Sequence, residues 1–178
     1  RIIRLEGAAS AMQDAVARVL KEGELIFRGD VISTGRGARL EMKLLDDAVI
    51  NLGEKTVFVV IDYVAGGATP SIATRLVEGA FTASAGGIAK SPGGSMRIES
   101  EVATAGIRGT TVWGGKLADK VEFALLSEGR VEIANRAGRV ELTRKNDGTK
   151  VGSQSTAPTK PEPWGGGMID HARATVAF

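Results

Sequence analysis

The stretch "GRVEIANRAGRVELTR" (Gly129–Arg144) carries the strongest indication of fold class in this sequence, because it repeats one short unit. Gly-Arg-Val-Glu followed by an aliphatic residue begins at Gly129 and again at Gly138. Within each copy apolar and charged residues alternate, as in a β-strand with one buried face. The pattern predicts two neighbouring strands, with Glu132 and Glu141 on the wetter face. The residues predicted to face the core are Val131, Ile133, Val140 and Leu142.

Similar short runs occur along most of the chain. "ARLEMKLL", "TVFVVIDYV" and "KVEFALL" are rich in aliphatic and β-branched residues, and turn signals such as Gly66-Gly67 separate them. Many short strands with frequent turns indicate an all-β domain, either a sandwich or a solenoid of short rungs. The nine-residue echo favours stacked, rung-like strands. We therefore expect a β-solenoid-like or sandwich-like single domain over residues 1–152, with an extended C-terminal tail over residues 153–178.

One run near the N-terminus, "GAASAMQDAVARVLK" (residues 7–21), is ambiguous. Its apolar residues fall at helical spacing, which predicts a helix of about three turns. The same run can also be read as two strands around a loop at Met12–Asp14. The residues alone leave both interpretations open.

Composition excludes several classes of chemistry. There is no cysteine, so disulfides and thiolate metal sites are impossible, and the single histidine, His171, cannot form a multi-histidine metal site or a catalytic triad. Lys and Arg number 23 against 21 Asp and Glu, without the basic excess of a nucleic-acid-binding protein. The sequence therefore predicts no catalytic residue, no metal site, no cofactor and no nucleic-acid partner.

The sequence shows no segment that would insert into a membrane. No apolar run approaches the ~18–20 residues that a membrane helix requires. The chain begins at Arg1 rather than Met, which leaves export open even though no signal peptide is visible.

Three patterns look like functional motifs but have simpler explanations. "ATAGIRGTTVWGG" (Ala103–Gly115) has the glycine spacing of a phosphate-binding loop, yet Gly115 stands where that loop requires lysine. The acidic pair Asp46-Asp47 lies between two apolar runs, as in a hairpin turn. The basic residues of segment 136–150 are interleaved with acidic ones, which indicates a solvated strand face rather than a polyanion site.

Arg108 stands alone among small residues and glycines. In a strand, Gly106 and Thr110 flank it on the same face and leave room for the guanidinium to lie across the sheet. Its five donors suit carbonyls or a carboxylate of neighbouring strands. We predict that Arg108 is a mostly buried structural pin rather than an anion site, with Asp30 or Asp47 as its carboxylate.

Four segments follow, in order, the pattern of a known family. They are "FRGDVISTG" (Phe27–Gly35), "ARLEMKLLDDAVINLGEKT", "GIRGTT" (Gly106–Thr111) and "GRVEIANRAGRVEL". Together they resemble a FecR-type domain over residues 1–152, although Asp47-Ala48 replaces the usual Asp-Gly turn. The positions that the resemblance marks as a structural signature are Gly29, Asp30, Thr34, Gly35, Gly106, Arg108, Gly109 and Thr110.

The resemblance implies a bacterial, exported, all-β domain without enzymatic activity, and it favours strands over the helix in residues 8–20. Members that regulate iron uptake also carry a membrane helix and a sigma-factor-binding segment, which this chain does not show. We therefore expect a non-enzymatic binding or scaffolding module of the bacterial envelope, in the periplasm or at the cell surface. The expected partner is a protein, and another copy of this chain is one candidate. A carbohydrate-active enzyme that uses carboxylates is a further hypothesis.

The C-terminal tail changes in composition. Residues 153–167 are rich in Pro and Gly and have no evident means of ordering themselves, whereas "ARATVAF" (Ala172–Phe178) alternates like a short strand. We predict that the tail docks on another subunit, which favours a subunit that self-assembles into a filament or sheet as the alternative function. The competing interpretation is that the tail folds back on its own domain. The candidate docking residues are Trp164, Ala172, Ala174, Val176 and Phe178.

Overall fold

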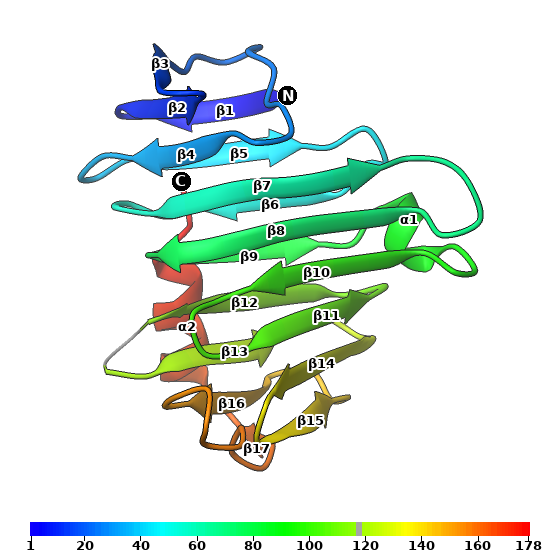
Figure 1. The fold of residues 1–178 in the computed structure, drawn as a ribbon. Coiled ribbons are helices and arrows are strands. Elements are labelled where there is room, and N and C mark those ends of the chain that lie inside the picture. Colours follow the sequence, from blue (N-terminus) through cyan, green and yellow to red (C-terminus); the bar gives the residue numbers. More distant parts are fainter. Residues whose placement is uncertain (117–118) are drawn as a thin grey trace.

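Strands are the main secondary structure of the computed structural model, which describes residues 1–116 and 119–178. They form two sheets that lie face to face (Figure 1). Sheet A contains, in spatial order, β1 (Ile2–Glu6), β5 (Arg39–Lys43), β6 (Val49–Leu52), β9 (Ala80–Ser84), β12 (Thr111–Lys116), β13 (Val121–Leu125), β16 (Asp147–Val151) and β17 (Glu162–Pro163). Sheet B contains β15 (Gly138–Leu142), β14 (Arg130–Asn135), β11 (Thr104–Arg108), β10 (Ser95–Glu99), β8 (Ser71–Glu78), β7 (Val57–Val64), β4 (Val31–Thr34), β2 (Ala9–Gln13) and β3 (Val16–Val19). Two helices, α1 (Gly87–Lys90) and α2 (Gly166–Ala174), complete the fold.

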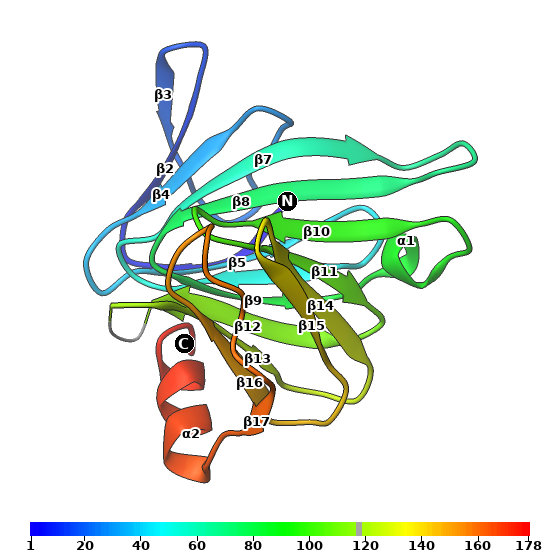
Figure 2. The ribbon, with the colours of Figure 1, turned by 60° about the horizontal axis from the view of Figure 1, so that its bottom comes forward.

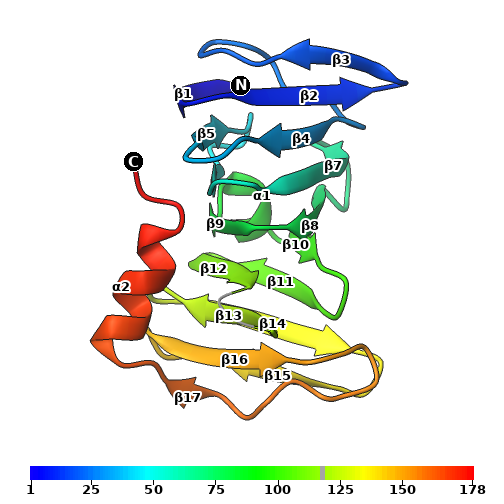
Figure 3. The ribbon, with the colours of Figure 1, turned by 90° about the vertical axis from the view of Figure 1, so that its left-hand side faces the viewer.

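The chain alternates between the two sheets and advances along them from the N-terminus toward the C-terminus (Figures 1 and 3). After β1 it enters sheet B for three strands, returns to sheet A for β5 and β6, and continues in this way to β17. The prediction of an all-β domain is confirmed, and of its two alternatives the sandwich is the one observed.

The solenoid interpretation is wrong, and the nine-residue echo shows why. Its two copies, β14 and β15, are the arms of one antiparallel hairpin rather than stacked rungs. Val131 lies opposite Leu142 and Ile133 opposite Val140, whereas rungs would place equivalent residues side by side in parallel. Among the strand pairs that the structure describes, only β8 and β10 run parallel. The predicted neighbours and faces are nevertheless confirmed, because Val131, Ile133 and Leu142 are buried and the opposing glutamates are exposed.

The ambiguous N-terminal run forms two strands, as the second interpretation predicted, but the turn lies at Asp14-Ala15 rather than at Met12–Asp14. β2 and β3 pair antiparallel and project from the end of the sandwich (Figure 2). The turn between them consists of Asp14 (φ +51°) and Ala15 (φ +64°), two residues in the left-handed region that suits a tight hairpin turn. The helical spacing of the apolar residues does not decide the structure here, because β4 offers β2 a partner strand.

The Asp46-Asp47 pair forms the turn between β5 and β6, as predicted. Asp47 has a φ of +67°. The carboxylate of Asp46 accepts hydrogen bonds from the N–H groups of Ala48 (3.3 Å) and Ile88 (3.1 Å). This acidic pair therefore shapes a turn and holds the start of α1.

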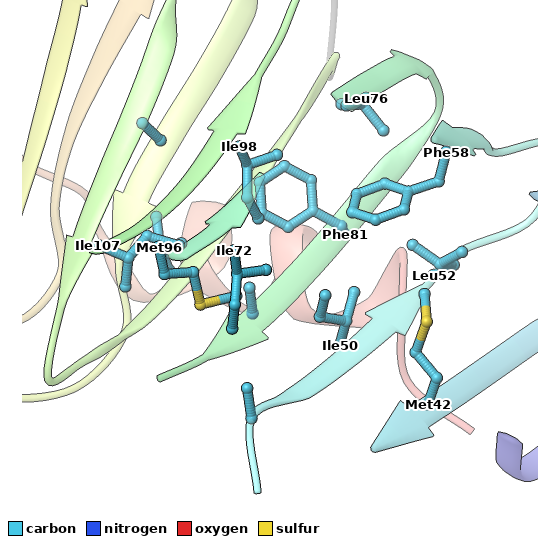
Figure 4. Packing of buried hydrophobic residues seen from close by; sticks show 14 of the residues in the cluster. Met42, Ile50, Leu52, Phe58, Ile72, Leu76, Phe81, Met96, Ile98 and Ile107 are labelled. Atoms are coloured by element: carbon cyan, nitrogen blue, oxygen red, sulfur yellow. The ribbon is translucent and has the colours of Figure 1, made fainter. Parts of the chain in front are cut away.

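The inner faces of both sheets supply one continuous apolar core (Figure 4). Phe58 of sheet B and Phe81 of sheet A are fully buried, with ring centroids 6.1 Å apart. Alternation along each strand sends one set of side chains into this core and the other set outward. Two outer faces remain, and they differ. Helix α2 covers part of the outer face of sheet A, whereas no described element packs over the outer face of sheet B (Figure 3).

Candidate functional site

The signature segment Gly106–Thr111 spans the crossing from β11 in sheet B to β12 in sheet A. Its second half is structural. Gly109 has a φ of +64°, and the buried Thr110 lies with its hydroxyl 3.0 Å from that of Ser127. A Cβ on Gly129 would lie 2.7 Å from the Cβ of Thr110, so the two turns interlock. Gly109 and Thr110 therefore fix the geometry of the crossing.

Arg108 does not lie where we predicted. Its side chain is exposed on the outer face of sheet B and makes no ion pair or hydrogen bond with any described residue. The reason is alternation, because Ile107 points into the core and Arg108 must then point outward, where nothing covers it. The prediction of a buried pin paired with Asp30 or Asp47 is wrong.

Asp30 has a different arginine as its partner. The fully buried carboxylate accepts hydrogen bonds from both terminal nitrogens of Arg18 (2.8 and 2.5 Å) and from the N–H of Phe27 (2.7 Å). Burial alone raises the pKa of Asp30, but these hydrogen bonds outweigh it and hold the pKa below its usual value. Arg18 comes from β3, and its role could not be recognised before that hairpin was known to fold over Asp30.

The other signature residues near Asp30 tie neighbouring segments together. Gly29 has a φ of +92°, a backbone conformation that favours glycine. The hydroxyl of Thr34 donates a hydrogen bond to the carbonyl of Gly53 (2.6 Å) and accepts one from the N–H of Thr56 (2.8 Å). The N–H of Gly35 donates to the carbonyl of Ala8 (2.8 Å). Gly29, Asp30, Thr34 and Gly35 therefore all have structural roles.

Arg108 belongs instead to a groove of about 300 Å³ on the outer face of sheet B. Strands β10, β11, β14 and β15 form its floor. Its polar lining consists of Ser95, Arg97, Gly106, Arg108, Arg130, Glu132 and Glu141. The sequence contained each of these residues in a strand-like run, but only the register β10–β11–β14–β15 brings them together. Of this set, sequence reasoning singled out Gly106 and Arg108 for the signature and missed the rest as a site.

The charges of the groove are only loosely paired. Arg108 and Arg130 lie directly opposite each other on β11 and β14, and like charges in such positions destabilise a sheet. Arg130 approaches Glu141 at 3.4 Å, with both side chains about half exposed or more. At the neighbouring edge, a hydrogen bond from Arg75 lowers the pKa of Glu99 against the raising effect of burial, and Arg97 adds a weaker one. Arg97 is therefore shared with Glu99, while Arg108 is left without a carboxylate among the described residues.

Gly106 lies in the lining of this groove and presents no side chain to it. Its φ is outside the left-handed region, and a Cβ there would meet nothing closer than the carbonyl oxygen of Glu132 at 3.9 Å. Neither backbone conformation nor packing within the chain therefore requires glycine. Glycine in the middle of a strand weakens it and often marks a place where another backbone approaches closely.

The C-terminal tail packs on its own domain, as the competing interpretation expected, and it does so as a helix, so the predicted strand is wrong. Of the candidate docking residues, Ala172 and Val176 are buried, four residues apart, and Ala174 is exposed. Phe178 is partly buried beneath Arg4, whose guanidinium carbon lies 4.2 Å from the centroid of the phenyl ring.

The fifth candidate, Trp164, packs edge-on against Trp113, with ring centroids 5.9 Å apart. The indole N–H of Trp113 donates to the hydroxyl of Thr175 (3.0 Å). The buried Trp113 forms part of the apolar surface on which the tail packs. Nothing in the structure supports self-assembly through this tail.

The Pro- and Gly-rich part of the tail also has its anchors. The amide of Asn135 donates to the carbonyls of Ser153 (3.0 Å) and Thr156 (2.7 Å). Further along, the hydroxyl of Thr149 donates to the carbonyl of Thr159 (2.7 Å). The segment is ordered by polar contacts with the sandwich, which composition alone did not reveal.

Two further observations bear on function. Within residues 1–116 and 119–178, no group of three or more His, Cys, Asp or Glu residues is arranged to hold a metal ion. Neither helix among these residues has the length and apolar character needed to cross a bilayer.

Comparison with known proteins points to one family. The family model described as FecR protein matches residues 30–140, which is more than half of the chain. No curated protein matches the sequence. Two crystal structures of a proposed anti-sigma factor from Parabacteroides distasonis have a similar fold, with TM-scores of 0.63 and 0.62 and 15% sequence identity. Each match covers 79% of this chain and 62% of the other, so this chain spans less than two thirds of those proteins.

Proposed function

This chain belongs to the FecR family, and from that premise we propose that it is a non-enzymatic protein-recognition module of the bacterial cell envelope. The proposed location is outside the cytoplasm, in the periplasm or at the cell surface. The proposed role is regulatory: the domain binds a partner protein and so contributes to a signal. The similarity in fold to a proposed anti-sigma factor supports a regulatory role over a purely structural one.

One observation carries this proposal. The signature segment Gly106–Thr111 divides into Gly109 and Thr110, which shape the crossing between the sheets, and Gly106 and Arg108, whose identity the packing of the fold does not require. An exposed arginine opposite a second arginine, beside a glycine that packing does not require, violates the local rules of a stable sheet. Such violations are typical of surfaces that recognise something. The groove around Gly106 is therefore the proposed recognition surface.

Site-specific photo-crosslinking in the native bacterium tests this proposal. A photoreactive amino acid at Ser95, on the rim of the groove, is expected to give one defined adduct with another protein. The matched control is the same amino acid at the exposed Asp170 of α2, on the other side of the sandwich. The adduct from Ser95 should disappear in the Arg108→Glu background. Absence of an adduct from Ser95, or the same adducts from both positions, would contradict the proposal.

A further inference from the structure

The charges of the groove form two rows that cross strands β11 and β14. In the first row Arg108 lies opposite Arg130, and both side chains are exposed. In the second row Glu141 lies opposite Glu132, and Glu132 lies opposite Gly106. Arg97 lies on the other side of Gly106 in the same row, where its side chain approaches Glu99 at 3.4 Å. The first row therefore brings two positive charges together, and the second brings two negative charges together, separated by Gly106 from Arg97.

Contacts within the chain pair these charges only weakly. The nearest opposite charges are 3.4 Å apart for Arg130 and Glu141, and 3.9 Å apart for Glu132 and Arg139. Both pairs are exposed, and such pairs are worth little. Arg108 has no such partner among the described residues. Two guanidinium groups side by side, by contrast, can bind one carboxylate with several charge-assisted hydrogen bonds.

The spacing of the rows matches an extended polypeptide. Gly106 and Arg108 are two residues apart in β11, so the rows are about 6.4–6.8 Å apart. An extended segment presents alternate side chains on one face with the same spacing. An acidic side chain over Arg108 and Arg130 would then be followed, two residues along the segment, by a side chain over Glu132 and Glu141. A basic side chain is the one that this second row would attract.

Gly106 provides the room for such a segment. A side chain at this position would stand in the groove between Arg97 and Glu132, whereas glycine lets another backbone approach the sheet. A polyanion such as a nucleic acid fits less well, because Glu132 and Glu141 would repel the phosphates that follow the first.

The geometry points to an extended segment of a partner protein that carries an acidic residue and, two positions away, a basic residue, laid along the groove over Gly106. This inference rests on the proposed function and adds the chemistry of the partner. The acidic side chain binds between Arg108 and Arg130, and the basic side chain binds at Glu132 and Glu141.

Nuclear magnetic resonance titration with short peptides tests this inference, because it detects affinities as weak as about 1 mM. The probes are four seven-residue peptides of alternating Thr and Val in which positions three and five are Glu and Lys, Glu and Glu, Lys and Lys, or Gln and Gln. The mixed Glu–Lys peptide is expected to shift the amide signals of Gly106, Arg108, Arg130 and Glu132. It should bind about tenfold more tightly than the Gln peptide.

Variants of the protein separate recognition from folding. Arg108→Glu together with Arg130→Glu should abolish binding of the Glu–Lys peptide and favour the Lys–Lys peptide instead. The matched control is Arg136→Glu, an exposed arginine in the turn between β14 and β15 that lies outside the groove, and it should leave binding unchanged. Gly106→Val should block binding and keep a folded amide spectrum.

Each other outcome would overturn the inference. Equal binding of the Glu–Glu and Glu–Lys peptides would reduce the groove to a simple anion site, and shifts produced equally by inorganic phosphate would show the same. No shift with any peptide would exclude the charge pattern that we infer. If the photo-crosslink from Ser95 persists in that case, protein recognition stands and only the chemistry of the partner is wrong. If the crosslink also fails, the proposed function fails with it.

Discussion

The two outer faces of the sandwich differ in how they use glycine. On sheet A, Gly148 lies under Trp164, and a Cβ there would be 2.2 Å from the indole ring. Gly53 lies under the carbonyl of Thr175 in the same way, with 2.2 Å between that oxygen and an added Cβ. On sheet B, Gly106 has open space above it. The first face is fitted to the tail that covers it, whereas no described element covers Gly106 on the second.

This difference separates structural positions from recognition positions without reference to conservation. A glycine whose missing Cβ is replaced by another part of the chain belongs to the fold. A glycine in a regular strand with nothing above it weakens the strand and gains nothing within the domain. The same criterion distinguishes arginines, because Arg18 binds a buried carboxylate whereas Arg108 binds none among the described residues.

The largest effect is expected on the covered face. Trp164→Ala should lower the free energy of unfolding by about 3–5 kcal/mol, because it removes a buried indole and leaves a cavity against Trp113. Urea unfolding monitored by circular dichroism measures this loss. Trp164→Phe should be much milder, since the indole N–H of Trp164 has no hydrogen-bond partner among the described residues. A loss below about 1 kcal/mol for the alanine variant would show that the tail is not part of the fold.

The second-largest effect is expected at Arg18, whose guanidinium binds the carboxylate of Asp30. Arg18→Ala should lower the free energy of unfolding by about 2–3 kcal/mol, because the fully buried Asp30 loses its counter-ion. The loss should stay below that of a wholly buried pair, because 29% of the Arg18 side chain is accessible. Arg18→Lys is the matched control and should retain part of the stability. If Arg18→Ala leaves the free energy of unfolding unchanged, Arg18 contributes no more to the fold than Arg108 is expected to.

The same pair predicts a dependence on pH. The pKa of Asp30 is lowered in the folded state, so its ionised form stabilises the fold above the unfolded pKa of about 3.9. That contribution is lost as the pH falls through the folded pKa. The difference in unfolding free energy between the wild type and Arg18→Ala should therefore be constant near neutral pH and shrink below about pH 4. A difference that grows on acidification would contradict this assignment.

A smaller effect is expected at the second glycine of the signature. Gly109→Ala places a side chain in the left-handed region at φ +64°, which should lower the free energy of unfolding by about 1–2 kcal/mol. No clash adds to this, because the nearest atom to an added Cβ is the Cγ of Lys90 at 4.0 Å. Thermal unfolding followed by calorimetry measures the shift. If Gly109→Ala leaves the free energy of unfolding unchanged, the turn tolerates a side chain, and Gly109 is no more required by the fold than Gly106.

The smallest effect on stability is expected at Arg108. Arg108→Gln should change the free energy of unfolding by less than about 0.5 kcal/mol, with a slight increase because the repulsion from Arg130 is removed. Urea unfolding at low and high salt measures it, and the increase should be larger at low salt. A loss of about 2 kcal/mol or more would restore Arg108 as a structural pin.

Local pattern predicted much of the fold. Alternation in Gly129–Arg144 identified two adjacent strands and their buried faces, because side-chain period follows directly from backbone geometry. It did not distinguish a hairpin from stacked rungs, since both have the same local pattern. Helical spacing in residues 7–21 misled for a related reason, as β2 becomes a strand only because β4 is available beside it.

The candidate site was harder to predict than the fold. The signature identified Gly106 and Arg108, but their meaning depends on which face is covered, and that is settled by a tail more than 50 residues later in the chain. Arg130, Glu132 and Glu141 join the site only through strand register. The predicted pairing of Arg108 with Asp30 is wrong because the hairpin β2–β3 brings Arg18 to this carboxylate, and no sequence pattern indicated that contact.

The most direct test of the account is the unfolding free energy of Gly106→Ala. We expect the free energy of unfolding to increase by about 0.4–1 kcal/mol, because alanine suits a strand better than glycine, reduces the entropy of the unfolded chain and has room above the sheet. The measurement is urea unfolding of Gly106→Ala and the wild type under identical conditions, with Gly109→Ala beside them. A decrease of about 1 kcal/mol or more for Gly106→Ala would contradict the account, since Gly106 would then be required by the fold itself.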